Sequence, residues 1–198
     1  MDYRKIAESI KNRIEKTHDR EAYKDLLALC IGYEAEDFAA AHQLNSEVRK
    51  MTSEALRNGN PKDAEYFYTL HKQSMLFDAP HDFDTFLLYV EMDRKPEKRF
   101  YAPRRRYLRP IVQGYQDVLD GKLRLLTISL PKRAGKSQLG INFINMISGR
   151  NPDKSSLMEG TGDDLVRSFY NGCLEYLQTP NEYLFYDVFP DAPLVQTN

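Results

Sequence analysis

Residues 123–149 read LRLLTISLPKRAGKSQLGINFINMISG, and this stretch decides the fold that the sequence predicts. Residues 125–130 form a short apolar run with strand-forming residues, the pattern of a buried central strand. Residues 131–137 follow at once, and a helical pattern then opens that Gly149 is suited to end. The apolar positions of this pattern lie on one face: Leu139, Phe143, Ile144 and Ile147. The stretch therefore predicts a strand, a loop and a helix in that order.

The chemistry of this loop favours phosphate. Backbone N–H groups at the start of a helix form an anion site, and Gly135 lets the chain approach a phosphate closely. Lys136 can reach the β- and γ-phosphates, and the Ser137 hydroxyl can ligate Mg²⁺. The full phosphate-loop pattern has a glycine five residues before Gly135, where this chain has Leu130. The position between strand and helix favours a nucleotide-binding loop over an ordinary strand–turn–helix corner.

The composition is that of a globular chain. Its 198 residues are 41% hydrophobic and 12% aromatic, which suits one domain, or one domain with an extension. No apolar run approaches the roughly eighteen residues of a membrane span, and the N-terminus has no signal-peptide pattern. The two cysteines, Cys30 and Cys173, favour free thiols in a reducing compartment over a disulfide or a metal site. We therefore expect a soluble intracellular protein.

The net charge of the chain is −1, but the charge is unevenly distributed. Residues 94–109 hold eight basic residues and one acid, Glu97, and so carry a net charge of +7. The basic residues are Arg94, Lys95, Lys98, Arg99, Arg104, Arg105, Arg106 and Arg109. Such a run is either a solvated surface or a segment that faces the phosphates of a nucleotide or of DNA. The interleaved aromatic residues suit base stacking or anchoring to the core: Phe100, Tyr101 and Tyr107.

Residues 1–78 are expected to be helical, because apolar residues recur every three or four positions. The residues Gly59-Asn60-Pro61 interrupt this pattern. A further helix is expected from the apolar residues Phe83, Phe86, Leu87 and Val90, and it should end near Lys95-Pro96. Residues 156–161 predict a second strand, and a helix with acids in its first turn follows at Gly162. The order strand–helix–strand–helix predicts a parallel α/β sheet, which two strands alone cannot complete.

Residues 121–190 resemble the start of the ATPase domain of tailed-bacteriophage terminase large subunits, the motors that pump DNA into procapsids. The resemblance rests on LRLLTISLPKRAGKSQLG (123–140) and on GRNPDKSSLMEGTGDDLVRSFYNGCLEYLQTPNEYLFYDVFP (149–190). Such proteins place a Pro-(Pro/Lys)-Arg-x-Gly-Lys-Ser loop after an apolar strand, commonly without the first glycine. The upstream RFYAPRRRYLRPIVQGYQDVLDG (99–121) resembles the lead-in segment that contributes adenine contacts. About 100 residues are covered.

The resemblance implies that ATP and Mg²⁺ are bound by the loop. The nucleotide-binding residues of the loop would be Pro131, Lys132, Arg133, Ala134, Gly135, Lys136, Ser137 and Gln138. Among them, Lys136 would hold the phosphates and Ser137 would ligate the metal. Arg133, or Lys132 beside it, would contact the γ-phosphate and sense hydrolysis.

The resemblance also implies adenine contacts from the lead-in segment. One of Gln113 and Gln116 would contact adenine together with Tyr101 or Tyr107, and we assign Gln116 and Tyr101.

The resemblance further implies the fold, the partners and the location. The fold class is the truncated start of a phosphate-loop NTPase parallel sheet, preceded by an all-helical N-terminal region. The domains would be 1–78 (helical) and 79–198 (incomplete ATPase domain), the latter with a lead-in part, 79–120, and the first βα units, 121–198. The partners would be double-stranded viral DNA, the portal protein, the small terminase subunit and further copies in a ring. The chain would work in the cytoplasm of the bacterial host, with no membrane contact.

The departures from the family concern catalysis. No residue fits the acidic Walker B pair that should end a later strand; Val188-Phe189-Pro190-Asp191 is the nearest candidate, and its proline argues against it. The coupling motif and the metal-binding nuclease domain are also missing. We therefore interpret the chain as an N-terminal portion that binds ATP and largely fails to hydrolyse it.

Two other classes of function remain open. A small phosphate-loop kinase would share the loop chemistry, but it needs later arginines, and after Asn151 only Arg167 is present. A non-enzymatic helical adaptor would bind nucleic acid or protein through residues 94–109. Loss of nucleotide binding in Lys136→Ala separates the first two classes from the third.

Overall fold

The computed structural model describes residues 3–17 and 19–192. Of these described residues, 69% lie in helices and none lies in a β-strand. The chain divides into two compact units, Met1–Asp78 and Ala79–Asn198.

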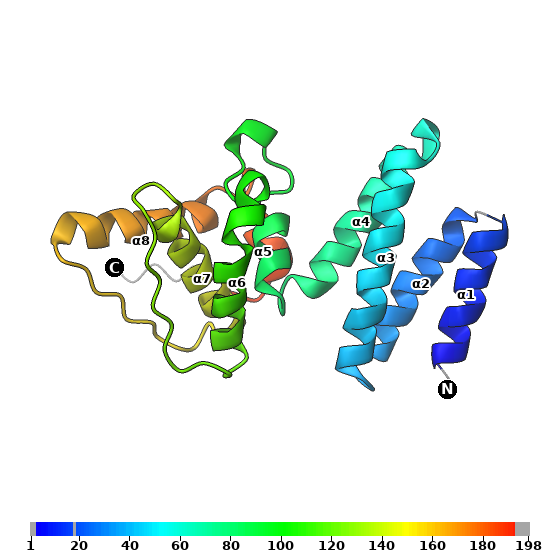
Figure 1. Cartoon of the computed structure of the whole chain (residues 1–198), viewed down its shortest axis with the longest axis horizontal. Coiled ribbons are helices and arrows are strands. Elements are labelled where there is room, and N and C mark those ends of the chain that lie inside the picture. Colours follow the sequence, from blue (N-terminus) through cyan, green and yellow to red (C-terminus); the bar gives the residue numbers. More distant parts are fainter. Residues whose placement is uncertain (1–2, 18, 193–198) are drawn as a thin grey trace. The chain divides into compact units, whose positions relative to one another are not determined.

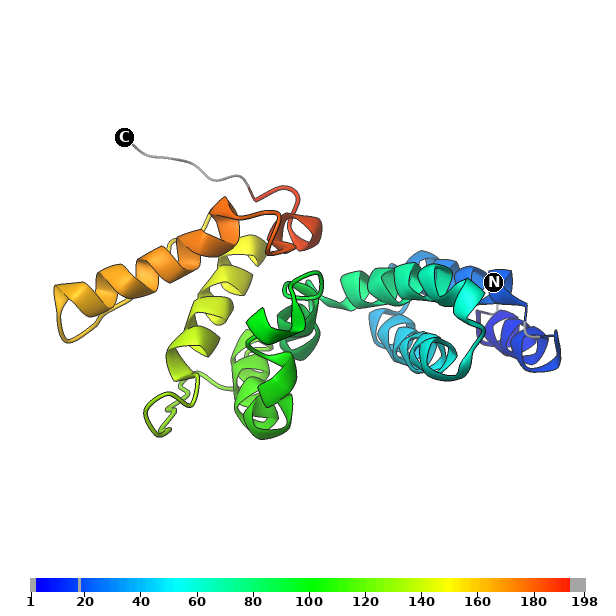
Figure 2. The ribbon, with the colours of Figure 1, turned by 90° about the horizontal axis from the view of Figure 1, so that it is seen from above.

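The first unit consists, in its described part, of α-helices that lie side by side (Figures 1 and 2). They are α1 (Tyr3–Thr17), α2 (Arg20–Tyr33), α3 (Phe38–Asn58) and α4 (Ala64–Asp78), with a short 3-10 helix, η1 (Pro61–Asp63), between the last two. The side chains of Asp19 and Asp37 begin α2 and α3 by accepting backbone N–H groups, each at 3.0 Å. Helices thus lie where the spacing of apolar residues predicts them, and the interruption at residues 59–61 is present.

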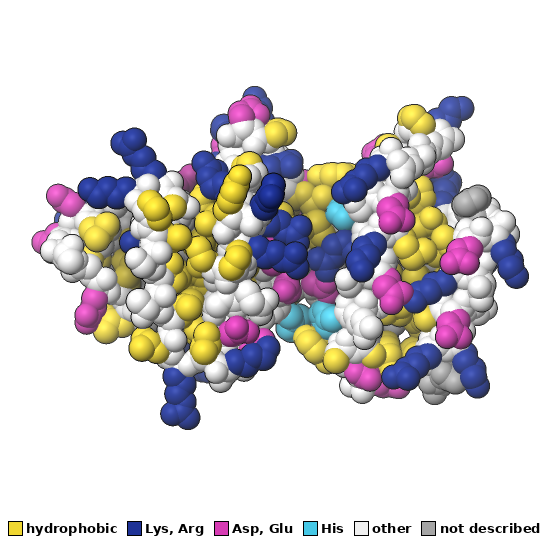
Figure 3. Space-filling model, in the orientation of Figure 1, with side chains coloured by type: hydrophobic (Ala, Val, Ile, Leu, Met, Phe, Trp, Pro, Cys, Tyr) yellow, Lys and Arg dark blue, Asp and Glu magenta, His cyan; other side chains and the backbone are white. Residues whose placement is uncertain are grey.

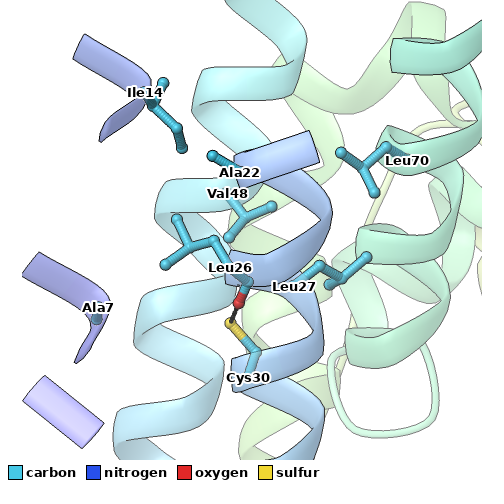
Figure 4. Packing of buried hydrophobic residues seen from close by; sticks show 8 residues of the cluster. All are labelled: Ala7, Ile14, Ala22, Leu26, Leu27, Cys30, Val48 and Leu70. Atoms are coloured by element: carbon cyan, nitrogen blue, oxygen red, sulfur yellow. Dashed lines mark hydrogen bonds between the residues drawn. The ribbon is translucent and has the colours of Figure 1, made fainter. Parts of the chain in front are cut away.

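The core of the first unit is apolar and closely packed (Figure 4). Ala22, Leu26 and Cys30 of α2 are fully buried, and they pack with Ile14 of α1 and Val48 of α3. The Cys30 thiol donates to the Leu26 carbonyl oxygen at 3.2 Å, and burial raises its pKa to about 12. Cys30 is therefore a protonated core residue with no nucleophilic character.

The second unit is also helical, and it carries the loop of interest. Its α-helices are α5 (Phe83–Tyr89), α6 (Arg105–Leu119), α7 (Lys136–Arg150), α8 (Asp163–Gln178) and α9 (Phe185–Val188), with the 3-10 helices η2 (Pro96–Lys98) and η3 (Ala102–Arg104). Aromatic rings form its core: Phe83 lies against Tyr115 and Phe143, and Phe86 lies against Phe189. Glycines let these helices approach closely, since a Cβ at Gly140 would lie 3.1 Å from the Phe169 ring.

The predicted parallel sheet is wrong, because residues 125–130 pair with no other strand (Figure 1). Their burial does alternate with the period of a strand: Leu126, Ile128 and Leu130 are half-buried, whereas the residues between them are exposed. Leu126 packs against Gly114 of α6, since a Cβ at Gly114 would lie 3.0 Å from the Cδ1 atom of Leu126. The segment therefore lies along the helices by one face only, with Leu125 81% exposed.

The second predicted strand, residues 156–161, is absent as well. Only Met158 in this segment is half-buried, and Leu157 is 85% exposed. Exposed hydrophobic side chains are visible on the surface of the second unit in Figure 3. A parallel ladder needs a neighbouring strand to pair with and cover on both faces, and the described residues supply neither. Local strand preference is present, but the non-local pairing that would make a sheet is not.

Candidate anion-binding site

A hollow with a volume of about 540 Å³ lies over the start of α7; we name it the anion hollow. It is lined by Phe100 and Arg104 and by loop residues 130–133 and 135–138. The cationic residues of this lining are Arg104, Lys132, Arg133 and Lys136. None of them forms an ion pair with the described residues, and no described carboxylate belongs to the lining. Such a lining favours an anion.

Two residues in left-handed conformations shape the loop. Gly135, the N-cap of α7, has φ +97°, and Arg133 has φ +65°. The Ala134 N–H donates to the Pro131 carbonyl at 3.3 Å, which closes a tight turn with Arg133 at its third position. Glycine adopts such a φ without strain, whereas arginine does so at a cost of about 1 kcal/mol. The strained Arg133 lines the anion hollow and contributes a positive charge to it.

The first turn of α7 directs backbone N–H groups towards the hollow. The first helical bond runs from the Leu139 N–H to the Gly135 carbonyl at 3.0 Å, so the N–H groups of residues 136–138 precede it. Lys136 and Ser137 are exposed in this turn, as the sequence predicts. Gln138 differs, because its side-chain amide donates to the Tyr176 hydroxyl at 3.0 Å.

The lining fits the phosphates of a nucleotide well and a metal ion less well. Four cations and a helix start match a polyphosphate in charge. For Mg²⁺, the described lining offers one side-chain ligand, the Ser137 hydroxyl, and the phosphate oxygens would supply others. No described carboxylate of the hollow could orient water for hydrolysis.

The two residues assigned to adenine lie elsewhere. Tyr101 is fully buried; its hydroxyl donates to Asp84, and burial raises its pKa. The Gln116 amide accepts the Phe83 N–H at 2.8 Å and donates to the His81 carbonyl and to Asp120 at 3.1 and 2.8 Å. Neither side chain belongs to the lining of the anion hollow. The adenine contacts therefore stay a prediction, and the positions of Tyr101 and Gln116 do not support it.

Phe100 and Arg104, rather than Tyr101 and Gln116, line the anion hollow. The buried Glu91 carboxylate fixes the backbone of this segment. Glu91 is 2% exposed, and its Oε2 accepts the N–H groups of Phe100 and Tyr101 at 2.8 and 3.0 Å. Burial raises the pKa of Glu91 above its usual value. The two backbone hydrogen bonds and the neighbouring Arg94 offset only part of this rise. Nothing in the sequence distinguishes this acid from the solvated acids of the chain.

The basic segment divides into internally bonded and free cations. Arg94 donates to the Tyr183 hydroxyl and to Glu182, at 2.7 and 3.0 Å. The other internally bonded cations are Lys98 with Glu182, Arg99 with the carbonyls of Met92 and Arg94, Arg104 with the carbonyl of Phe100, and Arg105 with Asp84. Among the described residues, the side chains of Lys95, Arg106 and Arg109 form no hydrogen bond or ion pair. The run of charge is therefore partly structural and partly available to a ligand.

Replacement of Gly135 by alanine should open the anion hollow. The new Cβ would lie 2.7 Å from two atoms of the Phe100 ring, and alanine at φ +97° is strained by about 1 kcal/mol. We expect Phe100 to be displaced and the affinity for tripolyphosphate to fall about tenfold. Isothermal titration calorimetry measures this change.

Gly121→Ala is the matched control, because Gly121 has φ +71° and nothing within 4 Å of a Cβ. It carries the same kind of backbone strain without the contact with Phe100. Equal tripolyphosphate affinity in the two variants would contradict the proposed role of the Phe100–Gly135 contact.

Among the described residues, no helix combines the length and the apolar character that crossing a membrane requires.

The comparisons with known proteins add no family to this description. No protein-family model, no curated protein and no solved structure matches this chain.

Proposed function

We propose that this chain binds ATP·Mg²⁺ through its triphosphate and is the ATP-binding N-terminal portion of a phage terminase large subunit, the motor that translocates viral double-stranded DNA. The observation that carries the proposal is the anion hollow at the start of α7, with no described carboxylate and with four cations that form no ion pair with the described residues. Left-handed Gly135 and the N-terminal turn of α7 support it, because both are what a phosphate-binding loop requires. The parallel sheet is not part of the proposal.

In this proposal each loop residue acts by binding and orienting. The N–H groups of residues 136–138 and the Lys136 ammonium group hold phosphate oxygens, and Ser137 ligates Mg²⁺. Lys132 and Arg133 neutralise the outermost phosphate from the rim. The lining offers no described carboxylate to orient water. Binding with negligible turnover is therefore the expected behaviour of this chain.

The resemblance supplies the rest of the proposal. Double-stranded DNA would meet the free cations of residues 94–109, where Arg109 and the 76% exposed Tyr107 lie on α6. The portal protein, the small terminase subunit and further copies of the chain would be protein partners, in the cytoplasm of the bacterial host. A second candidate is a helical adaptor that binds nucleic acid through the same segment, and the all-helical fold favours it.

The experiment that tests the proposal is titration of Lys136→Ala with ATP·Mg²⁺ by calorimetry. Wild type is expected to bind, and the variant is expected to lose at least about tenfold in affinity, because a charge-assisted hydrogen bond to phosphate contributes about 1.5–3 kcal/mol. Lys154→Ala is the control, since Lys154 is exposed and outside the anion hollow. Absence of binding by wild type, or equal binding by both variants, would favour the adaptor.

A further inference from the structure

The three consecutive arginines of the basic segment have three different environments. Arg105 forms an ion pair with Asp84, through its Nε atom at 3.0 Å and its Nη2 atom at 2.5 Å. Arg106 is exposed and forms no ion pair with the described residues. Arg104 lines the anion hollow, although it lies far from the loop in the sequence.

The side chain of Arg104 is held in place by Phe100. Its Nη1 atom donates to the Phe100 carbonyl at 3.0 Å, and its guanidinium group lies over the Phe100 ring, 5.4 Å from the centroid. The Phe100 ring lies directly against Gly135 of the loop. The Phe100 N–H is in turn fixed by the buried Glu91 carboxylate at 2.8 Å. Arg104 is thus attached to the loop through Phe100, and its orientation is supported by a buried acid.

The remaining donors of Arg104 are free. Apart from the bond to the Phe100 carbonyl, the Arg104 side chain makes no hydrogen bond with the described residues. Guanidinium groups bind phosphate oxygens in a forked geometry that a lysine cannot reproduce. A cation that is held in position, has no acidic partner and lines a hollow with three others is suited to an anionic ligand.

We propose that Arg104 is a ligand of the polyphosphate chain, a fourth cation supplied to the anion hollow from outside the loop. The inference rests on the proposed function, since it assigns a residue to the same site. The N-terminal turn of α7 and Lys136 suffice for a single phosphate. Arg104 contacts Phe100 rather than the loop, so we expect it to bind a ligand long enough to extend from α7 towards Phe100. Its contribution therefore grows with the number of linked phosphates.

The test compares inorganic phosphate, pyrophosphate and tripolyphosphate by calorimetry, each on the full chain. Arg104→Ala should weaken tripolyphosphate binding about tenfold and inorganic phosphate binding less than about twofold. Arg104→Lys keeps the charge and loses the fork, so it should fall between wild type and Arg104→Ala. Arg167→Ala is the matched control, because Arg167 of α8 is exposed and lies outside the anion hollow, and it should leave all three affinities unchanged.

The outcomes separate the inference from the proposed function. If Lys136→Ala weakens every phosphate ligand but Arg104→Ala matches Arg167→Ala, the loop binds phosphate and the assignment of Arg104 is overturned. If Arg104→Ala weakens all three ligands equally, it acts through the structure of the loop, and the assignment is again overturned. If Lys136→Ala changes none of the affinities, the proposed function itself fails.

Discussion

Replacement of Glu91 by alanine is expected to destabilise the second unit by about 3 kcal/mol, a typical loss when one partner of a buried ion pair is removed. The Glu91 side chain is 3% exposed and lies 3.5 Å from the Arg94 guanidinium group, whose side chain is 11% exposed. The substitution would leave the Phe100 and Tyr101 N–H groups without their acceptor. Arg94 would keep Glu182 and the Tyr183 hydroxyl, which limits the loss.

Urea denaturation measures the loss of stability, and hydrogen exchange locates it. The amides of Phe100 and Tyr101 should exchange much faster in Glu91→Ala, because both lose their hydrogen bond to Oε2. Glu91→Gln keeps an acceptor oxygen and should lose only about half as much stability. Glu97→Ala, at an exposed acid of the same segment, should have no measurable effect. Unchanged exchange at Phe100 and Tyr101 in Glu91→Ala would contradict this role of Glu91.

The same variant links stability to the anion hollow. Glu91 has no contact with the hollow, and it acts there only through the backbone of Phe100. Loss of that hydrogen bond should let Phe100 and Arg104 move away from the loop. If Arg104 is a ligand, Glu91→Ala should weaken tripolyphosphate binding more than inorganic phosphate binding. The stability change and the binding change would then have one cause.

The helices could be predicted from the sequence because their signal is local. The spacing of Ile6, Ile10 and Ile14 indicates α1, and the start of α7 beside Gly135 follows from the loop chemistry. The two strands were predicted from equally local signals, the apolar residues 125–130 and 156–161. A strand, however, exists only through its neighbours, and the described residues contain none for either segment. Local preference therefore predicted two strands and a sheet that the described residues do not form.

The residues of the site divide in the same way, into those that a local pattern indicates and those that tertiary packing brings to the hollow. Lys132, Arg133, Lys136 and Ser137 all line the anion hollow, because they are contiguous in the sequence. Phe100 and Arg104 belong to the hollow through tertiary packing against Gly135, and the sequence indicates only that the segment is basic and aromatic.

Tyr101 shows why neighbouring residues could not be assigned from composition. It adjoins Phe100 in the sequence, yet its ring is buried and its hydroxyl bonds to Asp84. Phe100 instead reaches the hollow, although both residues are aromatic. Composition identifies the segment, whereas tertiary contacts decide which residue lines the site: the Phe100 ring packs against Gly135, and the Tyr101 hydroxyl bonds to Asp84.

Replacement of Gly149 by alanine is expected to destabilise the second unit by about 3 kcal/mol, near the upper end of the usual cost of overpacking. Gly149 lies in the last turn of α7, and a Cβ there would lie 2.5 Å from Cγ of Phe189. Because Cγ is the ring atom nearest the backbone, rotation of the ring cannot relieve the overlap. Phe189 is itself enclosed by Phe86 and Phe185.

The helix propensity of alanine works in the opposite direction, which makes the result diagnostic. Alanine is favoured over glycine in a helix by about 1 kcal/mol, so a site without steric conflict should gain stability. Gly32 of α2 is such a site, since nothing lies within 4 Å of a Cβ there. Urea denaturation should therefore show stabilisation by Gly32→Ala and destabilisation by Gly149→Ala. Phe189→Leu added to Gly149→Ala should restore part of the loss, because the two effects share one contact. Stabilisation by Gly149→Ala would mean that Phe189 does not pack on α7.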